Sequence, residues 1–172
     1  MSTDAIVMLR EDHKRVRKLI RACRAADGDQ GTEGLAGDTS GQGEIVNELL
    51  HELTVHMFVE KEVMYPQVRR LMPETAPLVL EFQEEHHVAD VLARELAGMQ
   101  PGDESYAAKL HVLIDTVERH LAAEEQEWFP QVREALGRKE LQSIGVQTAA
   151  VRERAPERPH PSALSKLAEL TA

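Results

Sequence analysis

The chain has 172 residues, and its 30 Asp and Glu side chains against 20 Lys and Arg side chains give a net charge of −10. This balance argues against a nucleic-acid surface, which needs clustered basic side chains. The single cysteine excludes an intramolecular disulfide and a cysteine-built metal site. Because no segment has the ~18 apolar residues of a membrane span and no signal peptide is evident, we expect a cytoplasmic protein.

The residue composition favours helices. Ala, Leu, Glu, Arg and Gln are abundant, whereas aromatic residues make up only 3% of the chain, so we predict an all-α fold. Apolar residues recur at steps of three and four in four segments. These predicted helices span residues 3–26, 44–71, 76–99 and 103–136. Long helices with short connections fold back on one another, which predicts an up-down-up-down four-helix bundle.

Glycine and proline mark the breaks between these helices. Six of the ten glycines lie in residues 28–43, which predicts a flexible loop before the second helix. Pro73 and Pro77 mark the second break, and residues 101–102 mark the third.

The C-terminal part of the chain has a weaker helical pattern. We therefore divide the chain into a bundle, residues 1–137, and a helical or extended tail, residues 138–172. Within the tail, residues 138–153 predict a fifth helix, and Ser162 is a suitable N-cap for a last short one. We expect the tail to pack across one end of the bundle, and the alternative is a segment that docks a partner.

A histidine interrupts each of the four apolar stripes near its middle. In the second and fourth predicted helices a glutamate follows four residues later, so both side chains project from one helix face. A histidine or carboxylate in a helical core is costly unless its charge is compensated, and a bound cation compensates both. The six candidate metal ligands are His13, His56, Glu60, His86, His120 and Glu124.

The chain also repeats itself around these residues. Residues 56–69 align without gaps with residues 120–133, and six of the 14 positions are identical. Upstream, Glu-Asp-His at residues 11–13 parallels Glu-Glu-His at residues 84–86. Two helical hairpins of this kind would face each other about a pseudo-twofold axis, which predicts two equivalent half-sites and two metal ions.

This ordered set of residues resembles the hemerythrin-like proteins, also called the HHE cation-binding domain family. The resemblance runs from about Asp12 to Val132. Its matching residues are His13, His56-x-x-x-Glu60 ahead of Tyr65-Pro66, Glu85-His86, and His120-x-x-x-Glu124-Glu125 ahead of Phe129-Pro130. The resemblance implies a non-haem di-iron centre in which Glu60 and Glu124 bridge two iron ions that share an oxo or hydroxo group.

The chain departs from the oxygen-carrying members of that family. Those members have a second histidine one turn after the third-helix ligand, where this chain has Asp90, and a more widely spaced aspartate where it has Glu124. The implied ligands leave one open position on each iron, unless Asp90 fills one. Open positions favour turnover of small oxidants. We therefore rank hydrogen peroxide, in a catalase-like reaction, and nitric oxide ahead of oxygen carriage.

Whether the chain is an enzyme stays open. The alternative is a module that binds O2 reversibly, or senses iron or oxygen, without turnover. Three other interpretations fit less well. A metal-free bundle would bury Glu60 and Glu124 without a counter-charge, and a zinc site would have six ligands where zinc prefers four. A ferritin-like oxidase would have the motif Glu-x-x-His, whereas here the histidine precedes the glutamate by four residues. The expected partners are O2, H2O2 or NO, without nucleic acid or membrane, and the chain is expected to be a monomer or weak homodimer.

The remaining candidate residues are weaker. His51 and His111 are expected at the surface. The apolar stripe of the third predicted helix places His86, and not His87, towards the core. Tyr65 and Tyr106 could reach towards the centre, although a tyrosine at helical spacing is more often part of the core.

Overall fold

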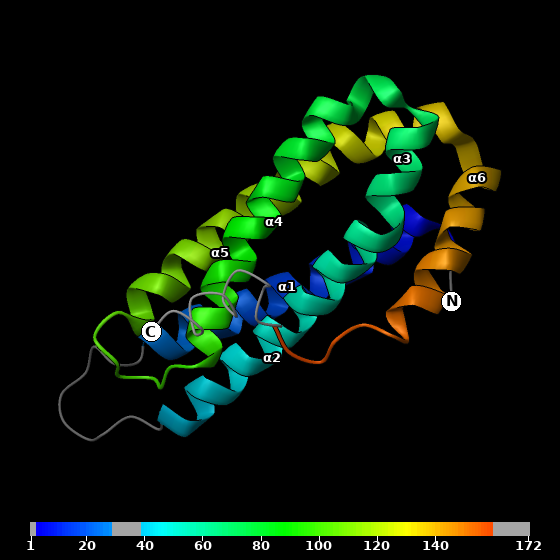
Figure 1. The fold of residues 1–172 in the computed structure, drawn as a ribbon. Helices are drawn as coiled ribbons and strands as arrows, with labels where there is room; N and C mark the ends of the chain where they lie inside the picture. Colours follow the sequence, from blue (N-terminus) through cyan, green and yellow to red (C-terminus); the bar gives the residue numbers. More distant parts are fainter. Residues whose placement is uncertain (1–2, 29–38, 160–172) are drawn as a thin grey trace, which may run out of the picture.

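The computed structural model describes residues 3–28 and 39–159, and these residues contain no strand. The α-helices are α1 (Ala5–Gly28), α2 (Thr39–Val59), α3 (Tyr65–Leu71), α4 (Ala76–Ala97), α5 (Tyr106–Ala123) and α6 (Phe129–Arg152). Short π-helical turns, Glu60–Met64 and Glu124–Trp128, join α2 to α3 and α5 to α6. The four predicted helices are therefore four arms of one bundle, which confirms the predicted fold class (Figure 1). None of the described helices is long and apolar enough to cross a membrane.

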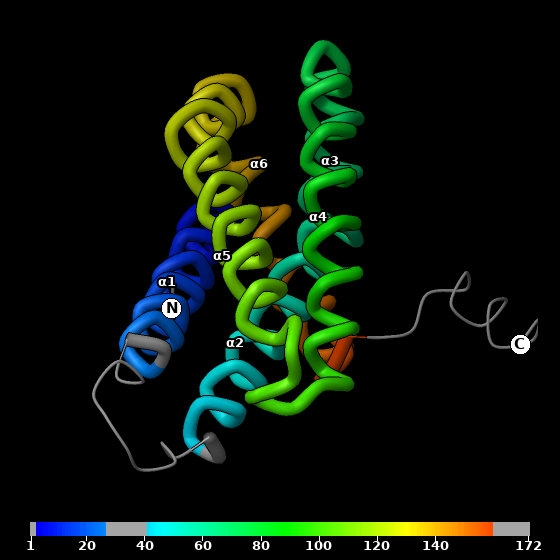
Figure 2. Tube along the Cα trace, turned by 90° about the vertical axis from the view of Figure 1, so that its left-hand side faces the viewer, coloured from blue at the N-terminus to red at the C-terminus, as the bar shows by residue number. Residues whose placement is uncertain are grey.

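The arms pair as the sequence repeat predicts. α1 packs against α2, and α4 packs against α5 (Figure 2). The predicted end of the loop at residue 43 was wrong, because α2 begins at Thr39 and residues 39–43 are helical. At Gly43 an added Cβ would lie 3.3 Å from the side chain of Pro101. The missing side chain of Gly43 thus lets this helix lie close to Pro101, although glycine is a poor helix former. Residues 29–38 lie outside the described part.

Two apolar clusters fill the bundle and enclose a polar layer. One cluster contains Val16 to Cys23 of α1, and the other contains Ala5 to Leu9 of the same helix. His13 lies between them, and the histidines of α2 and α4 lie between the same two clusters. The polar layer is therefore held in the middle of the bundle, with tightly packed apolar side chains on both sides of it.

The C-terminal helix is present and folds back on the bundle. The chain breaks its helical path at Gly137, which has φ 67° and ψ 178°, a backbone conformation that glycine tolerates best. Beyond it, Leu141 and Ile144 are fully buried in the cluster that also contains Ile6 of α1. Residues 138–152 therefore pack against one end of the bundle. The short helix expected from Ser162 lies outside the described residues.

This packing depends on a glycine. A Cβ at Gly145 would lie 1.7 Å from the carbonyl oxygen of Thr3 and 3.0 Å from the amide nitrogen of Ala5. Because both neighbours are backbone, we expect Gly145→Ala to lower the free energy of unfolding by about 2–3 kcal/mol, measured by urea denaturation. The control is Gly98→Ala, whose Cβ would meet only ordinary contacts at 3.5 Å. Equal effects of the two substitutions would contradict the prediction.

Candidate metal centre

Both candidate glutamates begin a π-helical turn that the sequence analysis did not predict. The amide of Tyr65 donates to the carbonyl of Glu60, and that of Phe129 donates to the carbonyl of Glu124. A proline follows each turn. Because proline has no N–H and clashes with the carbonyl four residues before it, a widened turn relieves the conflict. In the sequence, the π-helical turns could have been predicted from the Tyr-Pro and Phe-Pro pairs, because a proline inside a predicted helix disturbs its regular hydrogen bonds.

The π-turn explains the position of Tyr65. In a regular α-helix a residue five places after Glu60 would point about 140° away from it. The wider turn instead brings the Tyr65 hydroxyl to 3.3 Å from Oε2 of Glu60 and 3.2 Å from Oε1 of Glu124. The hydroxyl is also 3.1 Å from Nε2 of His86. Tyr65 is therefore part of the centre, whereas its repeat partner Phe129 stacks on His13 with ring centroids 5.5 Å apart.

The structure brings all six candidate ligands together in one layer. They form two groups that share Glu60. The groups are His13, His56, Glu60 and Glu124, and Glu60, His86 and His120. Within each group the potential ligand atoms lie within 4.8 Å of one another.

Each glutamate lies between histidines of opposite half-sites. Oε2 of Glu60 is 3.3 Å from Nε2 of His56 and 3.3 Å from Nε2 of His86. Glu124 is 3.3 Å from Nε2 of His13 through Oε2, and 3.6 Å from Nε2 of His120 through Oε1. Both carboxylates thus have the placement that a bridging ligand between two cations needs.

The spacing of the donor atoms suits metal coordination, and several of these atoms have no hydrogen-bond partner. With bonds of about 2.1 Å, adjacent ligand atoms of an octahedral ion lie about 3 Å apart, close to the separations above. Among the described residues, buried ligand atoms without a hydrogen-bond partner include Nε2 of His13, Nε2 of His56, Oε1 of Glu60 and Oε2 of Glu124. Buried polar atoms are ordinarily paired. A cation would satisfy these atoms, so the residues present fit the proposed group.

The electrostatics of the layer also favour a cation. Burial and the neighbouring Glu124 raise the pKa of Glu60 well above its ordinary value. Burial acts on Glu124 too, but His120 and His13 outweigh it and hold the pKa of Glu124 at about 2. Burial and His120 lower the pKa of His86, which keeps its ring in the neutral, metal-binding form. A cation would let both carboxylates carry their charge.

Three further carboxylates, which the sequence analysis did not assign, hold the histidine rings. Glu125 lies 2.7 Å from Nδ1 of His13, and Glu85 lies 2.8 Å from Nδ1 of His120. Asp12 lies 3.8 Å from Nδ1 of His56, an ion-pair distance that is too long for a hydrogen bond. Such contacts orient ligand rings and raise their basicity. The signal was an acidic residue beside each ligand motif, as in the parallel tripeptides 11–13 and 84–86.

Asp90, considered as a ligand, points elsewhere. Its carboxylate is 3.3 Å from the guanidinium of Arg94, and the side chain is 39% exposed. Tyr106 is also remote from the centre, because it packs in the apolar cluster that contains Cys23. His111 is exposed, as expected. His51 is half-buried instead, since its Nδ1 lies 2.8 Å from the carbonyl oxygen of Glu157.

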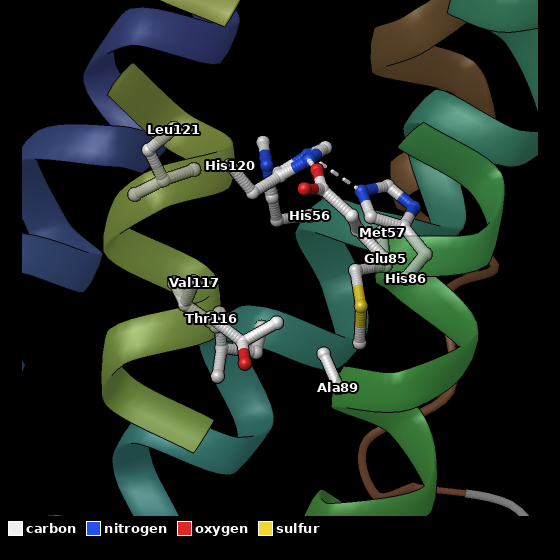
Figure 3. Close-up of a pocket in the computed structure, with 10 residues that line it drawn as sticks. His56, Met57, Glu85, His86, Ala89, Thr116, Val117, His120 and Leu121 are labelled. Carbon is white, nitrogen blue, oxygen red and sulfur yellow. Dashed lines mark hydrogen bonds and ion pairs between the residues drawn. The ribbon is translucent and has the colours of Figure 1, made fainter. Parts of the chain in front are cut away.

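A small cavity adjoins one side of the centre (Figure 3). Its volume is about 10 Å³, roughly what one water molecule needs. His56, Glu85, His86 and His120 border it at one end (Figure 3), and the rest of its lining is mainly apolar. The other lining residues are Leu53, Met57, Ala89, Thr116, Val117 and Leu121.

The adjacent histidines 86 and 87 give a direct test of the helix phase. His86 lies in the layer, whereas His87 is exposed on the outside of α4. We expect His86→Ala to lose at least one bound metal ion per chain, because it removes a ligand atom. His87→Ala should keep the wild-type content, measured by elemental analysis of untagged protein. Metal loss in the His87 variant would show that the assigned face is wrong.

The comparisons with known proteins agree with this geometry. The family model of the hemerythrin HHE cation binding domain matches residues 4–132. An uncharacterized hemerythrin-like protein of Schizosaccharomyces pombe is 23% identical over 121 residues, which cover 70% of this chain and 60% of that protein. The chain thus spans less than two thirds of that relative's length.

A solved structure shares the fold. The crystal structure of a hemerythrin HHE cation binding domain-containing protein from Mycobacterium kansasii has a TM-score of 0.68 and 22% sequence identity. The match covers 88% of this chain and 86% of that one. With a family match over most of the bundle and a buried His/Glu cluster that could hold metal, this chain belongs to the hemerythrin HHE cation-binding family.

Proposed function

We propose that this chain is a non-haem di-iron protein that consumes small oxidants, with hydrogen peroxide as the first candidate substrate in a catalase-like reaction. The observation that carries the proposal is the layer of candidate ligand atoms in the middle of the bundle. Two histidine pairs flank two carboxylates, and several of their atoms lack any hydrogen-bond partner among the described residues. In this proposal Glu60 and Glu124, together with the four histidines, would hold two iron ions and their oxo or hydroxo group.

The chain's own residues would divide the work at this centre. His13 and His56 would hold one iron, and His86 and His120 would hold the other. When bound, the two irons would supply the redox chemistry and Lewis acidity. Apolar packing on both sides of the layer excludes bulk water and strengthens the electrostatic interactions inside.

Tyr65 would hold a proton beside the centre. Burial and the two carboxylates raise its pKa well above the ordinary value, so the phenol stays protonated. Its O–H lies within reach of Glu124 and Glu60. A buried donor in this place can hydrogen-bond a small oxygen species at the second half-site and can return a proton to it.

Peroxide disproportionation balances without a further reactant. Two molecules of H2O2 give two of water and one of O2, so one peroxide is reduced while the other is oxidised. Reductive removal of nitric oxide would instead need an electron donor. Peroxide therefore provides the simpler first assay, and nitric oxide the second.

The test begins with iron content. Untagged protein expressed with iron should contain two irons per chain by elemental analysis, and it should release one O2 for every two H2O2 over many turnovers. One metal or none would overturn the di-iron proposal. Two irons with a stable, reversible oxygen-bound spectrum and no turnover would instead support the alternative, a module that binds O2 or senses iron or oxygen.

A further inference from the structure

We infer that the two half-sites are unequal: the His13–His56 half binds its metal tightly, and the His86–His120 half holds an exchangeable metal that small ligands reach. This inference rests on the proposed di-iron function. It comes from the contacts behind each histidine, from burial and from the position of the cavity. The sequence repeat by itself predicts two equivalent half-sites.

Carboxylates lie behind both histidines of the first half-site: one hydrogen-bonds to His13, and the other lies at a longer ion-pair distance from His56, whose Nδ1 has no hydrogen-bond partner among the described residues. Glu125 contacts His13 and is itself held by Arg17 at 2.7 Å. Asp12, which faces His56, accepts hydrogen bonds from Arg15 and from Arg152 of the C-terminal helix. Both histidines are essentially inaccessible, with 0% exposure for His13 and 1% for His56.

In the second half-site only His120, among the described residues, has a carboxylate behind it. Glu85 contacts His120, and its other partner is Arg119, 3.6 Å away and 67% exposed. In the described part of the chain, all polar contacts of His86 are made through Nε2, the atom that faces the centre. The repeat position equivalent to Glu125 is Lys61, which is exposed. Among the residues that the structure describes, therefore, no side chain contacts Nδ1 of His86.

The same half-site is the accessible one. The His86 side chain is 11% exposed. The cavity lies against both histidines of this half-site, His86 and His120, and against one histidine of the other, His56 (Figure 3). Asp90, one turn further along α4, turns towards Arg94 and leaves this side open. Because the lining beyond the histidines is mainly apolar, the cavity suits a small uncharged molecule better than an anion.

The test measures how fast each iron leaves the protein. Anaerobic ferrous protein loaded with two irons is mixed with excess bathophenanthroline disulfonate, and the coloured complex is followed over time. We expect two phases of one iron per chain each, with rates at least about tenfold apart, since one orienting contact changes metal affinity by about 10–100-fold.

Matched variants assign the phases. Glu125→Gln should accelerate the slow phase about tenfold, and Glu85→Gln should accelerate the fast one. Ala89→Val narrows the cavity and should slow the fast phase alone. The controls are Glu62→Gln and Ala97→Val, both at exposed positions, which should change neither phase. Circular dichroism checks that each variant is folded. If Ala89→Val does not fold, the Glu125→Gln and Glu85→Gln variants decide the result.

The outcomes separate this inference from the proposed function. A chain that binds two irons but releases both in one phase overturns the unequal half-sites and leaves the di-iron proposal intact. Acceleration of the fast phase by Glu125→Gln would overturn the assignment of the tight half. A chain that cannot be loaded with two irons overturns both.

Discussion

Glu60→Ala is expected to reduce bound metal from two ions to less than one per chain. Glu60 is the ligand common to both groups of donor atoms, and its Oε2 lies 3.3 Å from a histidine of each half-site. In the proposed di-iron centre, its loss would remove a ligand that both ions share, and Glu124 would be the one glutamate left to hold them. The control is Glu62→Ala, which changes an exposed carboxylate in the same π-turn and should retain both ions.

Thermal unfolding distinguishes a metal ligand from a structural residue at this position. In the metal-free protein, burial of Glu60 is unfavourable and its pKa is raised. The metal-free variant should therefore be at least as stable as metal-free wild type, while the stabilisation that added ferrous iron gives to wild type should disappear. Two ions per chain in Glu60→Ala, measured by elemental analysis, would refute its assignment as the shared ligand.

Asp12→Asn is expected to lower the free energy of unfolding of the metal-free protein by about 2 kcal/mol at neutral pH. Asp12 is only 2% exposed and joins His56 to Arg152, so it ties α1 and α2 to the end of α6. Burial raises the pKa of this carboxyl, but contacts with His56 and Arg152 outweigh burial and hold the pKa at about 2 instead of 3.8.

The pH dependence follows from the sign of this shift. Because the folded-state pKa lies below the unfolded value, the stabilisation by Asp12 is present above about pH 4 and is lost as the pH falls towards 2. Urea unfolding should thus show a gap between wild type and Asp12→Asn that narrows from pH 7 to pH 3. A gap that stays constant would mean that the charge of Asp12 is not what stabilises the fold.

The adjacent position provides the control for this experiment. Glu11 is 54% exposed and pairs with Lys14, which is 69% exposed. An exposed ion pair of this kind contributes little to stability. Glu11→Gln should therefore change the free energy of unfolding by less than about 0.5 kcal/mol at every pH.

The helices and the layer of candidate ligands were predictable because their signals are local. Apolar residues at steps of three and four locate each arm, and a histidine four residues before a glutamate shares its helix face whatever the rest of the chain does. His13 and His86 have the same phase as the apolar residues around them, so they were expected to face the core. The structure brings them to Glu60 and Glu124.

Features that depend on two arms at once were not predictable in this way. The phase of Tyr65 changes because a π-turn precedes Pro66, and α-helical periodicity assumes a constant turn. The carboxylates that hold the histidine rings come from other helices, so their partners follow from how the helices pack. Asp90 turned to Arg94 on its own helix, although its position also allowed it to face the centre.

The sequence by itself determined the helical arms, the repeat and the six residues of the buried layer, because these follow from periodicity along single helices. Only the tertiary structure decided which carboxylate supports which histidine, where the cavity opens and how the C-terminal helix reaches Asp12. Those properties are distances between side chains on different helices, and packing fixes them only when all four arms are in place.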